Sequence, residues 1–473
     1  MKFSGIALPL LFSLFCLQTA AQDKFTGSWE GKLNVGVELR LVFHINQSDG
    51  GYDGTMDSPD QGMKGMKLSR VVAYDDSLIV DMNSVGASYR GKTTTNEEIQ
   101  GKFVQKGMSF PLTLKKTEKP STLNRPQTPQ PPFDYGIEDI TYYNTDSSIR
   151  YGATITLPKG KGPFPAMMLI SGSGQQNRDS ELFGHKLFAV IADHLTKNGY
   201  IVLRADDRGM GQTTGKLATA TTADFAQDAE HGINYLKKRT EVDNSKIGLV
   251  GHSEGGMIAE MIAAKRSDIS FLILMAAPGV SNMQLLEDQN AALYEKAGLS
   301  KDKVEAYRKL YRNIVKAGVK SKDTVALYKA IAKVVADWKK KTPADVVLAT
   351  TGISDEASER KFVQTFADAF AKPWYKYFAA YDPKSNLQKT YAKILALNGD
   401  KDLQVVASSN VEGIRKALAK GKTKSFEVKV FPGLNHLFQT CKTCTIAEYA
   451  QLEETISPLV LKTMKEWLDK EVK

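Results

Sequence analysis

Residues 246–256 read KIGLVGHSEGG, and this stretch decides the fold. Its first five residues form a mostly apolar run short enough for a buried strand, and apolar residues recur at helical spacing over Met257–Lys265. A G-x-S-x-G pattern between a strand and a helix is typical of a very sharp turn that exposes the serine oxygen. The glycines are expected because a Cβ on either side of Ser253 would clash. The stretch therefore predicts a nucleophilic serine between a buried strand and a helix.

Strand and helix signals alternate on both sides of this stretch. Strands are expected at 149–157, 166–170, 200–204 and 271–275, and helices at 182–197 and 222–238. Strands that alternate with helices indicate a parallel sheet with helices on both faces. We therefore predict an α/β fold with a doubly wound, mostly parallel sheet.

The alternation stops at Pro278 and resumes at Lys393–Leu397. Between them, residues 281–390 are rich in Lys, Ala, Glu and Leu and show no strand signals. This composition predicts a helical insertion. The α/β core is then expected in two parts, residues 134–280 and 391–473.

The residues before the core have a different character. Short strands spaced about ten residues apart, with Gly and Asp turns, predict a small antiparallel barrel or sandwich over residues 22–118. The run GSWEG at Gly27–Gly31 resembles the first strand of lipocalin-like barrels. Five prolines within residues 119–133 predict an extended linker between this domain and the core.

The first residues have the pattern of a targeting segment. A positive Lys2, an apolar stretch at 6–17 and small residues at 19–21 predict a signal peptide over residues 1–21. This stretch is too short to anchor the chain in a bilayer, and no later segment is long and apolar enough to be a transmembrane segment. We therefore expect an exported protein, periplasmic or secreted.

Composition narrows the classes of partner. The chain has 473 residues, 42% of them hydrophobic and 25% charged, as is usual for a soluble globular protein. Its formal net charge is +10, but the lysines are spread along the chain, without a basic run interleaved with aromatic residues. We interpret the charge as solvated surface and expect no nucleic-acid partner.

Cysteine usage is sparse. Once Cys16 leaves with the signal peptide, Cys441 and Cys444 remain at C-x-x-C spacing. In an oxidising compartment this pair is a candidate for a local disulfide. A redox motif is less favoured because no thioredoxin-like context surrounds the pair. Only His436 lies nearby as a further ligand, so we expect no metal site, and no cofactor is expected either.

A serine on such a turn needs a histidine base and an acid, in the chain order Ser, then Asp or Glu, then His. Among the six histidines, His436 alone follows Ser253 in the chain. It comes just after the strand expected at 426–431. The C-terminal ends of the strands are where a doubly wound sheet presents its active site. His436 is therefore the expected base.

Two carboxylates compete for the role of the acid. Both lie in the turn NGDKD at 398–402, directly after the strand expected at 393–397. Asp402 precedes an apolar residue, which places it deeper and toward His436, whereas Asp400 is placed at the tip of the turn. We favour Asp402 and interpret Asp400 as a turn former.

The oxyanion of a tetrahedral intermediate needs preorganised hydrogen-bond donors. The backbone N–H of Glu254, at the start of the helix after the serine, is one expected donor. The second is expected from the run SGSG at 171–174, which follows a buried strand. The backbone N–H of Ser173 is favoured there, with Gly174 as the alternative.

Together these features resemble the α/β-hydrolase superfamily, and more narrowly an exported bacterial branch of esterases similar to prolyl-oligopeptidase-like serine peptidases. The runs that carry the resemblance are SGSGQQNRD at 171–179, DDRGMGQTTG at 206–215, GHSEGG at 251–256, LNGDKDLQV at 397–405 and PGLNH at 432–436. The resemblance implies that Ser253, Asp402 and His436 form a catalytic triad. It also implies that the helical insertion caps the site and that the N-terminal barrel is an accessory domain.

The sequence thus favours a serine hydrolase that cleaves small-molecule carboxylic esters through an acyl-serine intermediate. His185, Trp374 and Tyr377 are candidate substrate contacts, with helix capping or packing as their alternative roles. A serine aminopeptidase or dipeptidyl peptidase is the alternative enzyme, although no paired-Glu motif for a free amine is evident. A lipid- or small-ligand-binding protein with an inert hydrolase module is the alternative of another class. The sequence defines no oligomeric state.

Overall fold

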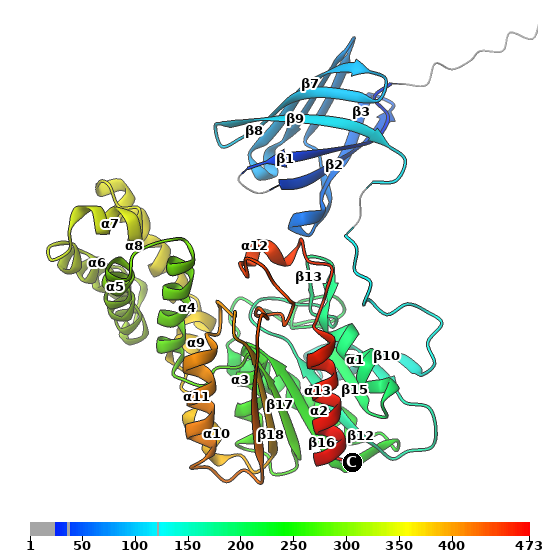
Figure 1. Ribbon diagram of the computed structural model, residues 1–473, viewed down its shortest axis with the longest axis vertical. Coiled ribbons are helices and arrows are strands. Elements are labelled where there is room, and N and C mark those ends of the chain that lie inside the picture. The colour runs from blue at the N-terminus through cyan, green and yellow to red at the C-terminus, as the bar shows by residue number, and fades with distance from the viewer. Residues whose placement is uncertain (1–23, 36–37, 121–122) are drawn as a thin grey trace, which may run out of the picture. The chain divides into compact units, whose positions relative to one another are not determined.

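A computed structural model describes residues 24–35, 38–120 and 123–473 (Figure 1). The chain divides into two compact units, Met1–Thr122 and Leu123–Lys473. The expected signal peptide, with Cys16, lies outside the described residues. Within the described ranges, no helix is both long enough and apolar enough to cross a membrane.

The N-terminal unit is an antiparallel β-barrel. Its strands are β1 Gly27–Asn34, β2 Glu38–Ser48, β3 Gly51–Ser58, β4 Met63–Lys67, β5 Arg70–Tyr74, β6 Ser77–Met82, β7 Ala87–Thr95, β8 Glu98–Gln105 and β9 Met108–Thr117. They follow the order β2-β1-β9-β8-β7-β6-β5-β3-β4, and an additional pairing of β2 with β3 joins the two ends of the sheet (Figure 1). The predicted small all-β domain is therefore confirmed.

Large side chains fill the interior of this barrel. Trp29, Phe43 and Tyr89 are fully buried. The indole N–H of Trp29 donates to the carbonyl of Phe25 at 2.7 Å, and the Tyr89 hydroxyl donates to the carbonyl of Ile99 at 3.1 Å. These rings occupy the space that a ligand would need, and their polar atoms bond to the barrel itself.

The sheet of the larger unit is mostly parallel. Its strands are β10 Gly136–Tyr143, β11 Arg150–Leu157, β12 Phe164–Ile170, β15 Ile201–Ala205, β16 Val242–His252, β17 Phe271–Met275, β18 Lys393–Gly399 and β19 Phe426–Phe431. They follow the order β10-β11-β15-β12-β16-β17-β18-β19, and β11 pairs antiparallel with both of its neighbours. From β15 to β19 the pairings are parallel, so the carboxyl ends of these strands meet at one edge.

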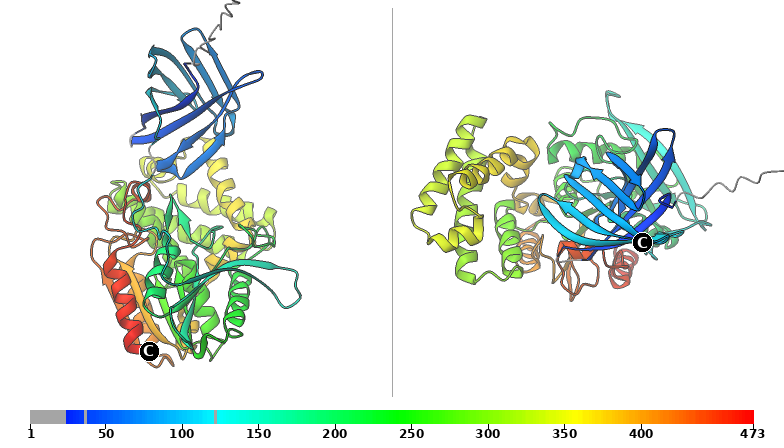
Figure 2. Two further views of the ribbon diagram at one scale, coloured as in Figure 1. Left: turned by 90° about the vertical axis from the view of Figure 1, so that its right-hand side faces the viewer. Right: turned by 90° about the horizontal axis from the view of Figure 1, so that it is seen from above.

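Helices cover both faces of this sheet, which confirms the predicted α/β class (Figures 1 and 2). Helices α1 Leu187–Lys197 and α13 Pro458–Glu471 pack together on one face. Helices α2 Thr222–Leu236, α3 Glu254–Ala263 and α11 Ala407–Leu418 cover the other. A short helix, α12 Ile446–Tyr449, lies in the loop before α13.

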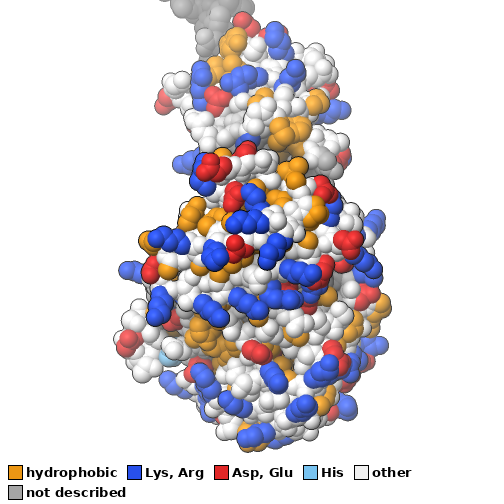
Figure 3. Space-filling view, turned by 90° about the vertical axis from the view of Figure 1, so that its left-hand side faces the viewer, with side chains coloured by type: hydrophobic (Ala, Val, Ile, Leu, Met, Phe, Trp, Pro, Cys, Tyr) orange, Lys and Arg blue, Asp and Glu red, His pale blue; other side chains and the backbone are white. Residues whose placement is uncertain are grey.

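A bundle of helices interrupts the strand alternation between β17 and β18. It comprises α4 Asn282–Lys296, α5 Lys301–Lys320, α6 Thr324–Lys339, α7 Ala344–Thr351, α8 Glu356–Ala371, α9 Pro373–Ala380 and α10 Lys384–Lys389. Residues 281–390 hold 20 Lys and Arg against 13 Asp and Glu. Figure 3 shows basic side chains spread over the face of the larger unit that carries α6 and α7, interspersed with acidic ones. This distribution agrees with the interpretation of the charge as solvated surface.

Two segments differ from the sequence expectation. The helix expected from residue 182 begins at Leu187, because a hairpin of β13 Glu181–Leu182 and β14 His185–Lys186 precedes it. Phe183 and Gly184 make its turn with positive φ angles of 52° and 74°, which a helix cannot accommodate.

The expected linker is also partly an element of the larger unit. The Arg125 guanidinium donates to the carbonyls of Phe183, Ala450 and Leu452 at 2.8 Å. The Gln127 side chain bonds to the backbone around Ile456. Residues 123–133 therefore pack along the larger unit instead of spanning open space.

The filled barrel generates a stability prediction. We expect Trp29→Ala to lower the free energy of unfolding of the N-terminal unit by about 3–5 kcal/mol, because the substitution leaves a large cavity. Urea unfolding followed by circular dichroism measures the change. Tyr74→Ala is the control: this ring is 54% exposed, so a change within about 0.5 kcal/mol is expected. Equal effects of the two substitutions would contradict a packed interior.

Candidate active site

Ser253 occupies the turn between β16 and α3. Its backbone angles, φ 55° and ψ −119°, lie outside the regions that residues with a side chain usually adopt. The Ser253 N–H donates to the carbonyl of Met275 at the end of β17, at 2.8 Å. The serine is thus held in a strained conformation at the carboxyl edge of the sheet, as strained residues at functional sites often are.

The two glycines flanking Ser253 are required by close backbone contacts. A Cβ at Gly251 would lie 2.2 Å from the carbonyl oxygen of Gly255. A Cβ at Gly255 would lie 2.0 Å from the carbonyl oxygen of Ile170, the last residue of β12. The expectation that side chains at the flanks would clash is therefore confirmed.

His436 and Asp402 form a buried pair. His436 lies in the loop after β19, and its Nδ1–H donates to Oδ2 of Asp402, in the loop after β18, at 2.8 Å. The other carboxylate oxygen, Oδ1, accepts the backbone N–H groups of Gln404 at 2.8 Å and Val405 at 2.9 Å. With the Nδ1 proton held by Asp402, Nε2 is the ring nitrogen left to accept a proton.

Asp400 has a different place from Asp402. Its Oδ1 accepts the backbone N–H of Gly433 at 2.6 Å, and its own N–H donates to the carbonyl of Phe431. Asp400 thus fixes the turn that leads to His436, whereas Asp402 contacts the imidazole itself. Of the two carboxylates considered from the sequence, the structure brings Asp402 to His436.

His252 is a site residue that the sequence interpretation missed. Its Nε2–H donates to the backbone carbonyl of His436 at 2.9 Å, and the centroids of the two rings lie 4.7 Å apart. Burial lowers the pKa of His252 to about 3, and the neighbouring His436 adds to this effect. A neutral imidazole therefore joins the residue before the serine to the loop that carries His436. The position of His252 directly before Ser253 was the available signal.

Residues 171–176, the Ser171 loop, follow β12 and lie against Ser253. A Cβ at Gly172 would be 3.2 Å from the Cβ of Ser253. The Ser171 hydroxyl donates to Oδ1 of Asp207 at 2.6 Å, and the Gln176 N–H donates to Oδ2 at 2.8 Å. Burial raises the pKa of Asp207 to about 7, although these two hydrogen bonds act in the opposite direction. Asp207 thus anchors both ends of the loop that contains Ser173.

The Glu254 side chain is a second feature that the sequence interpretation missed. It is 2% exposed, and its carboxylate accepts hydrogen bonds from Ser173, Thr222 and Trp374. Burial raises the pKa of Glu254, while the three hydrogen bonds lower it. Because Glu254 begins α3, its backbone N–H belongs to the first helical turn, whose N–H groups lack intrahelical acceptors.

A cavity of about 430 Å³ has Ser253 and His436 in its lining. Part of its apolar lining comes from α4 and α9, through Leu285, Leu286, Trp374, Tyr375 and Phe378, and the rest comes from core segments that include Leu187, Val405 and Leu437. Its polar part is rich in neutral side chains, namely Gln175, Gln176, Ser180, Gln289, Gln404 and Thr455. Within the described part of the chain, no Lys or Arg lines this cavity. The cavity therefore suits a neutral ligand with an apolar portion.

Of the two aromatic residues predicted to contact substrate, the structure brings only Trp374 to this cavity. Tyr377 borders a separate hollow with Met261 and Lys265, near the end of α3. Successive residues of a helix are turned by about 100°, so the cavity side of α9 presents Trp374 and Phe378 while Tyr377 points elsewhere. The prediction for Tyr377 is corrected on this ground.

His185 borders the cavity, but its ring nitrogens bond to the protein itself. Nε2 donates to the carbonyl of Tyr449 at 3.0 Å, and Nδ1 lies 2.9 Å from the hydroxyl of Thr455. Burial lowers the pKa of His185 to about 4, and the positive charge of Arg125 lowers it further. These contacts give His185 a part in holding the C-terminal loop, and a substrate contact stays a prediction.

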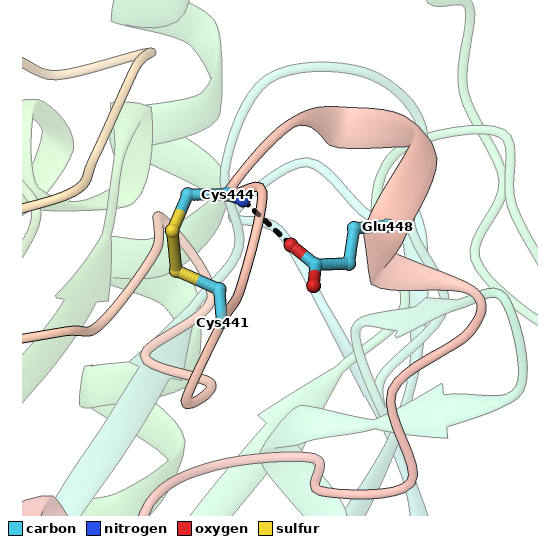
Figure 4. A group of neighbouring side chains, drawn as sticks. All are labelled: Cys441, Cys444 and Glu448. Atoms are coloured by element: carbon cyan, nitrogen blue, oxygen red, sulfur yellow. Dashed lines mark hydrogen bonds between the residues drawn. A yellow bond between two sulfur atoms is a disulfide. The ribbon is translucent and has the colours of Figure 1, made fainter.

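The two cysteines lie in the loop between His436 and α12 and are joined in a disulfide (Figure 4). The backbone N–H of Cys444 donates to a carboxylate oxygen of Glu448 at 2.6 Å. Cys441, Cys444 and Glu448 are close enough to share a metal ion, but thiolates are needed for such a site, and the disulfide removes them. The disulfide instead closes a short loop just beyond His436.

One known protein family matches more than half of the chain. The family described as X-Pro dipeptidyl-peptidase (S15 family) matches residues 146–408. This range includes β11 to β18, the helical bundle, Ser253 and Asp402, but it ends before His436.

Individual relatives cover less. Esterase EstD of Thermotoga maritima is 35% identical over 135 residues, which are 28% of this chain and 32% of EstD. This chain spans between about a third and a half of the lengths of the curated relatives that it matches. The solved structure of a Pyrococcus furiosus esterase, PF2001, is 14% identical, covers 76% of this chain and 100% of its own, and has a TM-score of 0.44. The solved structure of a Mycobacterium smegmatis proline iminopeptidase is 15% identical, covers 70% of this chain and 98% of its own, and has a TM-score of 0.41.

The buried His185 generates a prediction about acid stability. Unfolding lets this imidazole take up a proton near pH 6.5, whereas burial keeps it neutral in the folded protein down to about pH 4. The free energy of unfolding therefore decreases as the pH falls from about 6.5 to about 4, because only the unfolded chain binds a proton at His185 over this range. Between pH 7 and pH 5, we expect wild type to lose about 2 kcal/mol more unfolding free energy than His185→Gln. Urea unfolding at both pH values measures this, and equal losses would contradict it.

Proposed function

Because the chain belongs to the X-Pro dipeptidyl-peptidase (S15) family and is a serine hydrolase, we propose that it hydrolyses carboxylic esters through an acyl intermediate on Ser253. The observation that carries this proposal is the cavity whose lining holds both the strained Ser253 and His436, with Asp402 bonded to the imidazole. A nucleophile, a base and an oriented acid are the parts that acyl transfer requires.

In the proposed mechanism, the Ser253 oxygen attacks the ester carbonyl carbon while Nε2 of His436 takes the serine proton. Asp402 holds the Nδ1 proton and offsets the charge of the imidazolium. The tetrahedral intermediate then expels the alkoxide, which leaves as an alcohol after taking the proton from His436. Water, deprotonated by the same imidazole, attacks the acyl-serine and releases the carboxylic acid with Ser253 restored.

The oxyanion of each tetrahedral intermediate is assigned to two backbone N–H groups. One is that of Glu254, in the first turn of α3, and the other is that of Ser173, in the Ser171 loop. The closeness of Gly172 to the Cβ of Ser253 supports this assignment, because it brings the loop beside the nucleophile. Such donors typically contribute about 3 kcal/mol each to transition-state stabilisation.

Three observations favour an ester over a peptide with a free amino terminus. EstD is an esterase by name and is 35% identical to this chain over the aligned residues. The carboxylates that line the cavity are Glu181 and Glu254, and Glu254 is already occupied by three donors. Glu181, on the β13 hairpin, lies 3.9 Å from Lys186. A pair of free carboxylates for an ammonium group is therefore not present among the described lining residues.

Dipeptidyl-peptidase activity is the second candidate, because the family that matches the chain carries that name. The ligand-binding alternative has less support, since the barrel interior is filled by its own side chains and the larger unit contains the three residues that the proposed mechanism uses.

The helical bundle is proposed to be a cap that selects the acyl group. Helices α4 and α9 supply five apolar side chains of the lining, and Trp374 stacks on Phe378 with ring centroids 5.5 Å apart. An apolar acyl group in contact with these rings would leave the alcohol portion for the neutral polar side chains of the lining.

Export is also proposed. The charged, apolar and small residues at 1–21 support a cleaved signal peptide, and the disulfide between Cys441 and Cys444 suits an oxidising compartment.

A substrate panel tests the proposed reaction. We expect kcat/KM for p-nitrophenyl acetate and butyrate to exceed that for alanyl-prolyl p-nitroanilide by at least about 100-fold, since the cavity offers no amine clamp. A fluorophosphonate probe is expected to label wild type and not Ser253→Ala. The reverse ranking would establish the peptidase, and an unlabelled wild type would establish an inert module.

The two turn carboxylates give a matched pair of variants. Asp402→Asn is expected to lower kcat by about 100- to 10,000-fold, because the amide no longer orients and stabilises the imidazolium. Asp400→Asn keeps an acceptor for the Gly433 N–H, so kcat within about threefold of wild type is expected. Steady-state kinetics on the preferred ester measures both. A larger loss in Asp400→Asn than in Asp402→Asn would contradict the assigned acid.

A further inference from the structure

The Glu254 carboxylate accepts hydrogen bonds from three different elements of the fold. Its Oε2 accepts the hydroxyl of Ser173, in the Ser171 loop, at 2.8 Å. Its Oε1 accepts the hydroxyl of Thr222, at the start of α2, at 2.6 Å and the indole N–H of Trp374, on α9, at 2.8 Å. A core helix, a cap helix and the loop beside the nucleophile therefore meet at one side chain.

The position of this carboxylate is electrostatically unfavourable for the proposed chemistry. It belongs to the residue whose backbone N–H is assigned to the oxyanion, and a nearby negative charge opposes the development of another. Burial of a carboxylate is also costly unless donors surround it. A side chain that only filled this space could be apolar. The presence of an acid with three donors therefore indicates that the hydrogen bonds themselves matter.

Two carboxylates hold the Ser171 loop, one at its ends and the other at its middle. Asp207, in the loop after β15, holds Ser171 and Gln176 at the two ends of the Ser171 loop. Glu254 holds Ser173, at the middle of the loop, and is itself bonded to Trp374. Trp374 lines the cavity, so a ligand in the cavity can contact its indole ring. The middle of the loop is thus linked to the cavity wall through one carboxylate.

We infer that Glu254 is a positioning residue that couples Trp374 of the cap helix α9 to Ser173 of the Ser171 loop. An acyl group seated against Trp374 fixes the indole N–H on Oε1, which fixes Oε2 for the Ser173 hydroxyl. The backbone N–H of Ser173 is then held where the oxyanion forms. This inference rests on the proposed function for its catalytic consequence, but the physical coupling can be measured without any substrate.

Hydrogen exchange measures the coupling directly. In Trp374→Phe, which removes the indole N–H and keeps an aromatic ring, we expect amide exchange in a peptide spanning residues 171–176 to rise at least threefold. Trp338→Phe is the matched control, because it removes an indole N–H that donates to the carbonyl of Ala306 in the same helical bundle, away from Glu254. No change in residues 171–176 is expected there. Equal exchange in wild type and Trp374→Phe would overturn the inference.

Reactivity of Ser253 toward a fluorophosphonate provides the catalytic readout. Ser173→Ala keeps the backbone N–H and removes only the hydroxyl that bonds to Glu254. We expect Trp374→Phe and Ser173→Ala each to slow labelling at least fivefold. The labelling rate of the double variant is expected to be at least fivefold higher than the rate obtained by multiplying the two single effects. Coupled residues deviate from independence in this way, whereas unconnected ones do not. Trp374→Phe combined with Ser270→Ala, whose hydroxyl donates to the carbonyl of Ile247 outside the cavity, should show independent effects.

Substitution of Glu254 separates coupling from general packing. Glu254→Gln can still accept from Trp374 and Thr222 and can donate to the Ser173 hydroxyl, so it is expected to label at least fivefold faster than Glu254→Ala. In Glu254→Ala, adding Trp374→Phe should change exchange of residues 171–176 by less than 1.5-fold. If Glu254→Ala fails to fold, the pair of Trp374 and Ser173 variants still decides. Independent effects of Trp374→Phe and Ser173→Ala on labelling would overturn the inference. A wild type that the probe does not label would overturn the proposed function. In that case the hydrogen-exchange measurement alone decides the coupling.

Discussion

The contact between the start of α3 and the end of β12 is the constraint on which the site depends. Gly255 lies so close to the carbonyl of Ile170 that no side chain fits between them. This contact forces the sharp turn at Ser253, and it also brings the loop that leaves β12 beside the serine. The nucleophile and the proposed oxyanion donors therefore come from one packing contact between a helix and a strand, and the strain at Ser253 is held by the hydrogen bond to Met275.

The other half of the site is built by the C-terminal loops and joined to the turn through His252. This imidazole donates a hydrogen bond to the backbone carbonyl of His436, and the two rings lie beside each other in a tilted arrangement. A second positive charge there would oppose the imidazolium that the proposed mechanism forms on His436. Burial lowers the pKa of His252 to about 3, so this imidazole is neutral near pH 7. A neutral polar link can thus position the base without disturbing its proton transfer.

The sequence predicted the α/β class and the pairing of Asp402 with His436 because each depends on local signals: apolar runs, glycine turns and the order of residues along the chain. It missed β10, an edge strand whose side chains are mostly exposed and which therefore lacks a buried apolar run. It also missed the side-chain role of Glu254, because Ser173, Thr222 and Trp374 come together only in the folded protein. Tyr377 was misplaced because composition alone does not give the rotation of α9.

The site separates chemistry from selection. Ser253, Asp402 and His436 bond to strand ends and C-terminal loops, whereas α4 and α9 supply five of the apolar lining residues of the cavity. Changes in α4 can therefore reshape the acyl pocket without moving the catalytic groups. Changes at Trp374 are different, because its indole bonds to Glu254, and Glu254 bonds to the loop beside the nucleophile. Under the proposed function, an apolar substitution at Leu285 or Leu286 alters the fit of the substrate without removing a side-chain hydrogen bond, while at Trp374 any gain in fit has to preserve a hydrogen bond to the carboxylate.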